Sequence, residues 1–298
     1  MCRLSILNNV GNTPLLRLNS FQDKIIFGKW EAKNPMGSIK DRAALNMIET
    51  ALRDGKINPD TTVVEATSGN TGIGLAFVCA VKGINLRIYL PEHMSEERKK
   101  ILKAFGTQLV LTPKSGGISA SVAAAKDFAK ANNAYYIDQF NNPANAMAHY
   151  IGTAPEIYRD MKGEIGAIVC TIGSSGTITG IGNFIKSIDK NIKIIGVEPS
   201  SSPTIKSNIS APHKIQGIAP GFVPGIYNPK VVDDIICVSD EEAYDMTRYL
   251  AKKEGLFVGI SSGACVAASL KLPMDKPIVA ILPDTGERYL SVENLFNA

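Results

Sequence analysis

The sequence has few of the residues that build metal sites and disulfide frameworks. Its five cysteines form no Cys-x-x-Cys pair, their number is odd, and only three histidines occur among 298 residues. Structural zinc sites need clustered cysteine or histidine ligands, so we expect neither a metal site nor a Cys–His catalytic pair. Four of the cysteines lie within apolar runs, which favours a packing role over a role as ligand or nucleophile.

Long hydrophobic runs and strong charge of one sign are also lacking. No run of about 18 apolar residues occurs, and the N-terminal segment has no sustained apolar core like that of a signal peptide. The 32 basic and 28 acidic residues are spread along the chain, whereas nucleic-acid binding needs basic residues concentrated on one surface. We therefore expect a cytoplasmic protein with no membrane span and no nucleic-acid partner.

Short β-rich runs alternate with longer helical patterns from one end of the chain to the other. This alternation predicts an α/β fold, with parallel sheets covered by helices on both faces. The predicted strands are 25–31, 61–66, 86–91, 108–112, 134–138, 167–172, 193–199, 234–239 and 278–283. The predicted helices are 41–54, 71–82, 95–105, 119–132, 145–161, 177–187, 240–254 and 263–271. The longest stretch without a regular pattern, 213–229, has the length of a functional loop.

A lysine occupies an unusual place at the start of the first predicted helix. Ser38 followed by Asp41 forms a capping-box pattern, which predicts Ser38 as the N-cap. The helix carries an apolar stripe made of Ala44, Met47, Ile48, Ala51 and Leu52. The stripe extends back to Lys40 and predicts that this lysine lies on the buried face. Because burial and the helix dipole both disfavour the charged amine, we expect a lowered pKa for Lys40, which suits Schiff-base chemistry. The alternative is an ordinary surface lysine.

Three junctions between a strand and a helix are rich in glycine, serine and threonine, and ligands of parallel sheets bind at such junctions. One of them, Gly173–Thr177, brings backbone N–H groups and hydroxyls to a helix N-terminus, which is typical of a phosphate site. Its spacing fits neither a Walker A loop nor a dinucleotide fingerprint. The alternative is a turn that simply requires glycine.

The junction that contains Thr67–Gly72 has more side-chain donors than a connecting turn needs. Together with the amides of a helix start, these donors suit a small carboxylate, and a well-capped helix is the alternative. Lys40 and a phosphate site whose pattern does not fit a nucleotide, taken together with these donors, indicate pyridoxal phosphate, which is an aldehyde with one phosphate. The contrasting hypothesis is a nucleotide-binding or regulatory α/β protein that forms no Schiff base.

Recognisable motifs occur nearly from end to end of the chain and include "GNTPLLRL", "NPMGSIKDR", "EATSGNTGIGLA", "GSSGTITG", "HKIQGI", "GISSGA" and "LPDTGERYLS". In these motifs the chain resembles the cysteine synthase (O-acetylserine sulfhydrylase) family of fold-type II pyridoxal-phosphate enzymes. The resemblance implies two three-layer α/β/α domains with mostly parallel sheets. A smaller mobile domain, 40–143, would carry the loop for the substrate carboxylate. A larger domain, 1–39 and 144–298, would hold the cofactor phosphate, and the family is usually homodimeric.

The resemblance also implies roles for individual residues. Lys40 would bind pyridoxal 5'-phosphate covalently and later move the α-proton of the substrate. The implied ligands of the substrate carboxylate are Thr67, Ser68, Asn70, Thr71 and Gln139. The implied cofactor contacts are Asn70 at the ring hydroxyl, and Gly173, Ser174, Ser175, Gly176 and Thr177 at the phosphate. Ser261 would bond the pyridine nitrogen, ahead of its neighbour Ser262.

The reaction implied by the resemblance is β-replacement, in which O-acetyl-L-serine and sulfide give L-cysteine and acetate. A neutral serine at the ring nitrogen makes the cofactor a weaker electron sink, which favours prompt loss of a β-leaving group. The same chemistry could serve a cysteine lyase that releases hydrogen sulfide, or an enzyme that condenses thiols. "GSSGT" stands where typical synthases have "GTGGT", and Pro220 in "QGIAPGF" departs from "QGIGAGF", so the second substrate stays open. The C-terminus of serine acetyltransferase, a partner of some relatives, is a candidate partner.

Overall fold

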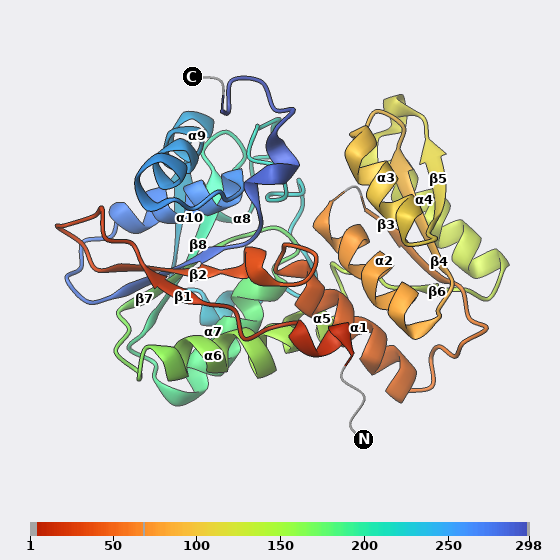
Figure 1. Ribbon diagram of the computed structural model, residues 1–298, viewed down its shortest axis with the longest axis horizontal. Coiled ribbons are helices and arrows are strands. Elements are labelled where there is room, and N and C mark those ends of the chain that lie inside the picture. Colours follow the sequence, from red (N-terminus) through yellow and green to blue (C-terminus); the bar gives the residue numbers. More distant parts are fainter. Residues whose placement is uncertain (1–4, 68, 297–298) are drawn as a thin grey trace. The chain divides into compact units, whose positions relative to one another are not determined.

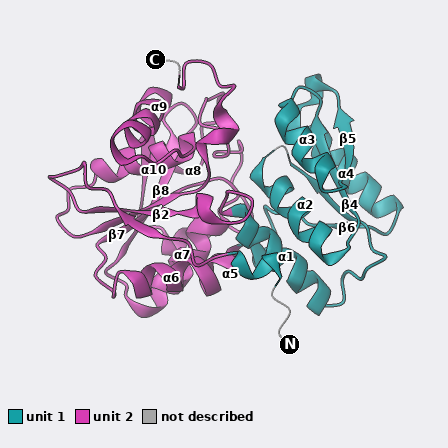
Figure 2. Ribbon diagram, viewed as in Figure 1, with its two compact units in different colours: residues 1–10, 40–145 teal, residues 11–39, 146–298 magenta. Residues whose placement is uncertain are grey.

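The computed structural model describes residues 5–67 and 69–296, and its chain divides into two compact units (Figures 1 and 2). Unit 1 contains residues 5–10 and 40–145, and unit 2 contains residues 11–39 and 146–296. Each unit has a sheet of its own with helices on both faces, which confirms the predicted fold class. The division differs from the predicted one because residues 5–10 belong to unit 1 and because unit 1 ends at 145 rather than 143.

Unit 1 is built on a parallel four-stranded sheet with the order β5-β4-β3-β6. Its strands are β3 (Val63–Ala66), β4 (Leu86–Pro91), β5 (Gln108–Thr112) and β6 (Tyr135–Tyr136). Its helices are α1 (Lys40–Arg53), α2 (Asn70–Lys82), α3 (Glu96–Ala104) and α4 (Gly117–Ala131), and the short turn η1 (Ile6–Asn9) precedes them. Every predicted strand and helix of this unit forms, although β6 is shorter than the predicted 134–138.

The core of unit 1 follows from the alternation of its strands. Val64 and Ala66 point to one face of β3, where they pack with Tyr89 and with Ala125 of α4. Glu65 lies between these two residues in the sequence, so its side chain points to the other face of the sheet. The side chain of Glu65 is nevertheless fully buried. A charged residue is thus enclosed at the carboxyl end of a central strand.

Unit 2 is built on a six-stranded sheet with the order β1-β2-β10-β7-β8-β9. Its strands are β1 (Leu15–Arg17), β2 (Ile26–Trp30), β7 (Ala167–Thr171), β8 (Lys193–Pro199), β9 (Asp234–Val238) and β10 (Ile278–Leu282). All neighbours are parallel except β1, which pairs antiparallel with β2 at the edge of the sheet. Strand β1 was not predicted, because three residues are too few to show a periodicity.

The helices of unit 2 cover both faces of its sheet (Figure 1). They are α5 (Pro143–Ala148), in which the chain passes from unit 1 to unit 2, α6 (Ala154–Asp160), α7 (Gly176–Ile188), α8 (Thr204–Ser207), α9 (Asp240–Tyr249) and α10 (Ile260–Leu270). Ala167 and Val169 of β7 pack in one apolar cluster with α10, while Ile168 and Cys170 pack in a second cluster with α6 and α7. This period of two explains why a strand buried on both faces reads as a continuous apolar run.

Two predicted helices are interrupted by π-helical turns. The predicted helix 145–161 consists of α5, a π-turn at His149–Thr153 and α6, and the predicted helix 240–254 ends in a π-turn at Leu250–Glu254. Such turns are common at functional sites. Within the described residues, no helix is long and apolar enough to span a bilayer.

Candidate functional site

Lys40 is the first residue of α1. The residue before the helix is therefore Ile39, and Ser38 forms an isolated β-bridge with Asp284. The predicted stripe is correct for Ala44, Met47, Ile48 and Ala51, which are buried, whereas Lys40 and Leu52 are only half-buried. The helix end explains the exposure of Lys40, because no earlier turn of α1 covers it.

The first turn of α1 lies close to α2. A Cβ added to Gly74 of α2 would lie 3.0 Å from the carbonyl oxygen of Lys40 and 3.1 Å from the Cβ of Ala44. A side chain at position 74 would push the two helices apart, so glycine permits their close approach. The backbone of Lys40 is thereby fixed against the helix that follows the threonine-rich junction.

That junction begins with Thr67, directly after β3, and continues into α2 at Asn70. The hydroxyl of Thr71 donates to Oε1 of Gln139 over 2.7 Å, and both residues are buried. The structure thus brings together two predicted carboxylate ligands that lie 68 residues apart in the sequence. Because Oε1 of Gln139 accepts this bond, the NH₂ group of the same side chain is the donor that a carboxylate would need. Ser68, another predicted ligand, lies outside the described residues.

Glu65 contacts the backbone of Gln139, one member of this pair, and was not among the predicted site residues. Its carboxyl group accepts the backbone N–H of Ala66 at 2.7 Å and the backbone N–H of Gln139 at 3.1 Å. Burial raises the pKa of Glu65 to about 7, although both backbone hydrogen bonds act in the opposite direction. The signal that could have found it is a glutamate inside the otherwise apolar and β-branched run "TTVVEA".

The loop Gly173–Thr177 connects β7 to α7 in unit 2. Ser175, directly before α7, has a φ of +68°, a left-handed conformation that serine seldom adopts. Ser174 and Ser175 are buried, and no side chain caps the described N-terminus of α7. Within the described residues, the buried Oγ of Ser175 has no hydrogen-bond partner. An orphaned hydroxyl beside uncapped helix amides fits the phosphate of pyridoxal phosphate.

Glycine is required at the first position of this loop. A Cβ at Gly173 would lie 2.5 Å from the carbonyl oxygen of Gly217, which belongs to the "HKIQGI" segment. The N–H of Ala219 also donates to the carbonyl oxygen of Ile172 at 2.8 Å. The segment 217–219 is thus fixed against the loop.

Thr177, the last residue of the loop, lies near a buried histidine. Its Oγ1 is 3.4 Å from Nε2 of His149, and Nδ1 of His149 is 2.9 Å from Oγ1 of Thr153. His149 stands in the π-turn between α5 and α6. The irregular turn therefore places an imidazole beside the start of α7.

Ser261 and Ser262 both lie in the first turn of α10. This helix begins at Ile260, three residues before the predicted start at 263, because the "GISSGA" motif is itself helical. Both serines are buried, and the Oγ of Ser262 has no hydrogen-bond partner in the described part of the chain. The structure therefore does not separate the two serines as contacts of a ring nitrogen.

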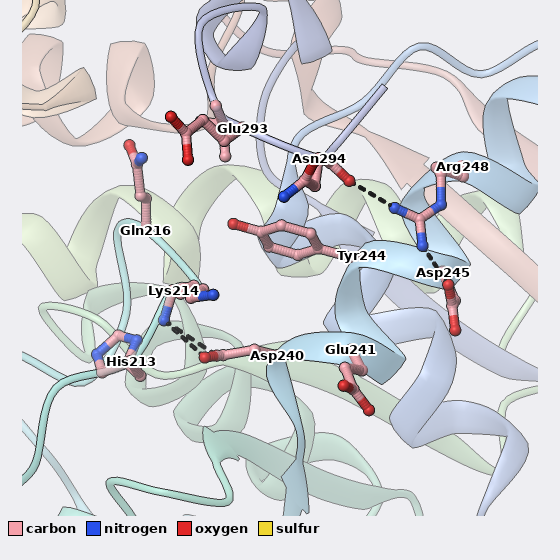
Figure 3. Close-up of a pocket in the computed structure, with 11 residues that line it drawn as sticks. His213, Lys214, Gln216, Asp240, Glu241, Tyr244, Asp245, Arg248, Glu293 and Asn294 are labelled. Atoms are coloured by element: carbon pink, nitrogen blue, oxygen red, sulfur yellow. Dashed lines mark hydrogen bonds and ion pairs between the residues drawn. The ribbon is translucent and has the colours of Figure 1, made fainter. Parts of the chain in front are cut away.

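A separate pocket of about 760 Å³ in unit 2 is lined by residues of the segment 213–216, of α9 and of the segment 292–294 (Figure 3). Asp240 accepts the backbone N–H of Lys214 at 3.0 Å, and Arg248 donates to the carbonyl oxygen of Asn294 at 2.8 Å. The ring of Tyr244 projects between Lys214 and Asn294 (Figure 3). None of the predicted site residues lines this pocket. Among the described residues, no group of three or more His, Cys, Asp or Glu could hold a metal ion.

The comparison with protein families identifies the chain. The model of the family described as "Pyridoxal-phosphate dependent enzyme" matches residues 6–284. The chain belongs to this family. This membership confirms the predicted enzyme class and the predicted cofactor. It agrees with the unpartnered hydroxyl of Ser175 in the candidate phosphate loop and with the family resemblance seen in the motifs.

Individual relatives cover almost the whole chain. A cysteine synthase of Staphylococcus aureus is 43% identical over 295 residues, which are 96% of this chain and 95% of the relative. A cysteine synthase structure from Entamoeba histolytica has a TM-score of 0.94 at 38% identity and covers 98% of this chain and 90% of that chain. A hydrogen sulfide-producing enzyme from Fusobacterium nucleatum has a TM-score of 0.91 at 40% identity and covers 96% and 99% of the two chains. The predicted resemblance to cysteine synthases is therefore confirmed.

Proposed function

We propose that this protein is a cysteine synthase that converts O-acetyl-L-serine and sulfide to L-cysteine and acetate. The observation that carries the proposal is the hydrogen bond between Thr71 and Gln139, which joins two predicted ligands of the substrate carboxylate in a member of a pyridoxal-phosphate dependent family. The similarity to the cysteine synthases of Staphylococcus aureus and Entamoeba histolytica supports the choice of substrates.

The carboxylate of the substrate is held in unit 1 in this proposal. Thr67, Asn70, Thr71 and Gln139 are its ligands, together with Ser68 as predicted from the sequence. Gln139 offers its NH₂ group, because the hydroxyl of Thr71 occupies its carbonyl oxygen. An amino acid bound in this way has its α-carbon fixed by its own carboxylate, which limits the rotation of the reacting bonds.

Unit 2 holds the phosphate and the ring of the cofactor. The residues that would hold the phosphate, with backbone N–H groups and hydroxyls at the start of α7, are Gly173, Ser174, Ser175, Gly176 and Thr177. Ser261 would hold the pyridine nitrogen, and the resemblance assigns the ring hydroxyl to Asn70. Pyridoxal phosphate, when bound, supplies the electron sink that allows bonds at the α-carbon and β-carbon to break.

Lys40 performs the proton transfers of the reaction. Its Nζ would hold the aldehyde of pyridoxal phosphate in the resting enzyme. In the reaction the lysine amine accepts the α-proton of the substrate, while the C–O bond to acetate breaks and acetate departs with the electron pair. Sulfide subsequently adds to the β-carbon, and the proton held by Lys40 returns to the α-carbon to give cysteine.

The Lys40→Ala variant tests this proposal. We expect the wild-type protein, supplied with pyridoxal phosphate, to show the visible absorbance of a covalently bound cofactor and to form cysteine. The variant should lose both the absorbance and about 1,000-fold or more of the rate, because positioned acid–base and covalent catalysis are removed together. A colourless wild-type protein that forms no cysteine after cofactor supply would contradict the proposal.

A second candidate is release of hydrogen sulfide from cysteine. It is favoured by the similarity to the hydrogen sulfide-producing enzyme of Fusobacterium nucleatum, which extends over 99% of that chain. Both reactions use the same carboxylate, phosphate and lysine contacts, so a rate comparison distinguishes them. If sulfide is released from cysteine faster than acetate is released from O-acetylserine, the lyase reaction is the principal activity.

We also propose that the protein is a cytoplasmic homodimer and that the C-terminus of serine acetyltransferase binds to it, as the family resemblance implies. Light scattering of the purified protein measures the oligomeric state directly. A calorimetric titration with a peptide of the acetyltransferase C-terminus, with a scrambled peptide as control, tests the partner.

A further inference from the structure

The backbone of Gln139 is held by hydrogen bonds on both of its sides. Its N–H donates to Oε2 of Glu65 at 3.1 Å, and its carbonyl oxygen accepts from Nδ2 of Asn145 at 2.8 Å. The residue before it, Asp138, has a φ of +54°, so the chain reaches Gln139 through a left-handed turn that costs about 1 kcal/mol or more for a non-glycine residue. The surrounding contacts must therefore maintain this turn.

Glu65 is the charged member of these contacts. It stands at 0% exposure on the central strand β3, and the N–H of Ala66 at 2.7 Å occupies its other carboxyl oxygen. The phenol of Tyr136, a residue of the neighbouring strand β6, acts to lower the pKa of this carboxyl group. Since Tyr136 and Gln139 belong to β6 and to the segment that follows it, Glu65 connects the central strand to the edge strand at the carboxyl end of the sheet.

The series of contacts continues from Gln139 to the substrate-binding junction. Gln139 accepts the hydroxyl of Thr71 at 2.7 Å, and Thr71 stands in the first turn of α2. A buried carboxyl group, the backbone of a turn, a side-chain amide and a threonine hydroxyl are thus joined in one sequence of hydrogen bonds. Each member is buried, so an unsatisfied group in it would be costly.

We propose that Glu65 is a positioning residue that acts through Gln139: its carboxyl group fixes the turn that presents the Gln139 amide to the carboxylate of an amino-acid substrate. The proposal rests on the proposed function, in which Gln139 binds that carboxylate. Glu65 itself contacts neither substrate nor cofactor. Its contribution is therefore to the affinity for the amino acid, and the chemical step proceeds at an unchanged rate once the amino acid is bound.

The charged form of Glu65 is the form that serves this role, because an ionised carboxylate accepts both backbone N–H groups. Burial, reinforced by the charge of Asp138, raises the pKa of Glu65, while the two backbone N–H groups and the Tyr136 phenol lower it, with a net value of about 7. Protonation places a hydrogen on one oxygen and weakens one of the two accepted bonds. We therefore expect weaker amino-acid binding as the pH falls from 8 to 6.

The test uses the holoenzyme and L-alanine, an amino acid that has the α-carboxylate but no β-leaving group. The dissociation constant is measured by calorimetry for the wild type, Glu65→Gln, Gln139→Ala and the double variant. Glutamine has the shape of glutamate but replaces one acceptor oxygen by a donor, so the Glu65→Gln variant should bind L-alanine about tenfold more weakly. In assays with O-acetylserine, its KM should rise by a similar factor while kcat stays within about twofold.

The double variant separates positioning from general damage. If Glu65 acts through Gln139, the double variant binds L-alanine as weakly as Gln139→Ala alone, because the amide that Glu65 positions is already absent. Additive losses would overturn the proposal. The difference between pH 6 and pH 8 seen in the wild type should also shrink in Glu65→Gln, whereas an unchanged difference would assign the pH dependence to other groups and would contradict the proposal.

Glu198→Gln is the matched control. Glu198 is a buried glutamate in β8 of unit 2, and it likewise accepts two backbone N–H groups, from Ile205 at 2.8 Å and Lys206 at 3.0 Å. Its substitution should lower thermal stability without changing the dissociation constant of L-alanine. An equal loss of affinity in both variants would show that any buried glutamate has this effect and would overturn the proposal.

The Gln139→Ala variant distinguishes failure of the proposed function from failure of the role of Glu65. If Gln139→Ala leaves the affinity for L-alanine unchanged, the carboxylate site of the proposed function is wrong. If Gln139→Ala loses affinity and Glu65→Gln does not, only the role of Glu65 is refuted.

Discussion

The threonine–glutamine pair of unit 1, Thr71 and Gln139, and the loop Gly173–Thr177 of unit 2 solve the same task in different ways. Each is suited to an anion at the carboxyl end of a parallel sheet. In unit 1 the donors are side chains held by a buried, ionisable glutamate. In unit 2 the donors are mainly backbone amides at the start of α7, in a loop shaped by the left-handed Ser175 and by the close approach of Gly173. Side-chain chemistry therefore controls the first region, and backbone geometry controls the second.

The largest effect should appear in the pH dependence of stability that arises from Glu65. A rise in its pKa from 4.5 to about 7 means that the folded protein binds this proton more tightly than the unfolded chain does. The neutral acid contributes about 3 kcal/mol to the free energy of unfolding. This contribution is fully present below pH 4.5 and is lost as the pH rises through about 7. The free energy of unfolding of the wild type, measured relative to Glu65→Gln by urea denaturation, should fall by about that amount between pH 5 and pH 8. A constant difference would show that Glu65 does not titrate in this range.

The opposite pH trends for affinity and for stability follow from one buried carboxyl group. The ionised form holds Gln139 in place, and the same form is the one that burial disfavours. Unit 1 is therefore less stable at neutral pH than it would be with a neutral Glu65, while the backbone of Gln139 is held by the ionised carboxylate. Such a conflict between stability and local function is common at binding sites.

The next largest effect is expected from Gly173→Ala in the loop of unit 2. The new Cβ would lie 2.5 Å from a backbone oxygen of Gly217, so the loop or the 217–219 segment must move, at a cost of about 1–3 kcal/mol. Because the amides of the loop are displaced, the dissociation constant for pyridoxal phosphate should rise by about tenfold or more. Equilibrium dialysis of the apoprotein measures it. Unchanged cofactor affinity would show that the backbone of this loop does not bind the phosphate.

The smallest effect is expected from Ser175→Gly, which also sharpens the contrast between backbone and side chain. Glycine adopts the φ of +68° without the cost that serine bears, so the apoprotein should gain about 1 kcal/mol of stability in thermal denaturation. The substitution removes the orphaned Oγ but keeps the backbone amides, so cofactor affinity should fall by only about fivefold. A loss as large as that of Gly173→Ala would mean that the hydroxyl, and not the backbone, holds the phosphate.

Much of the architecture follows from local sequence patterns. Apolar runs such as "AIVCTI" and "IVAILP" indicate strands covered on both faces, and the helical spacing of Ala44, Met47, Ile48 and Ala51 predicts the buried face of α1. The glycine- and serine-rich junctions predicted both candidate anion sites for the same reason, since strand ends and helix starts can be recognised locally. Family motifs then predicted individual roles, including those of Lys40 and Ser261, and these stay predictions.

Only the tertiary structure decided how distant residues meet. The contact between Thr71 and Gln139, the support of Gln139 by Glu65 and the bridge between Ser38 and Asp284 join segments that no periodicity relates. The left-handed Ser175 was likewise unpredictable, because serine seldom adopts this conformation by its own preference. The sequence by itself determined the elements and the chemical groups at their ends, since these depend on near neighbours. Packing between elements determined the ionisation of Glu65 and the direction in which Gln139 presents its amide, since both depend on what burial places around them.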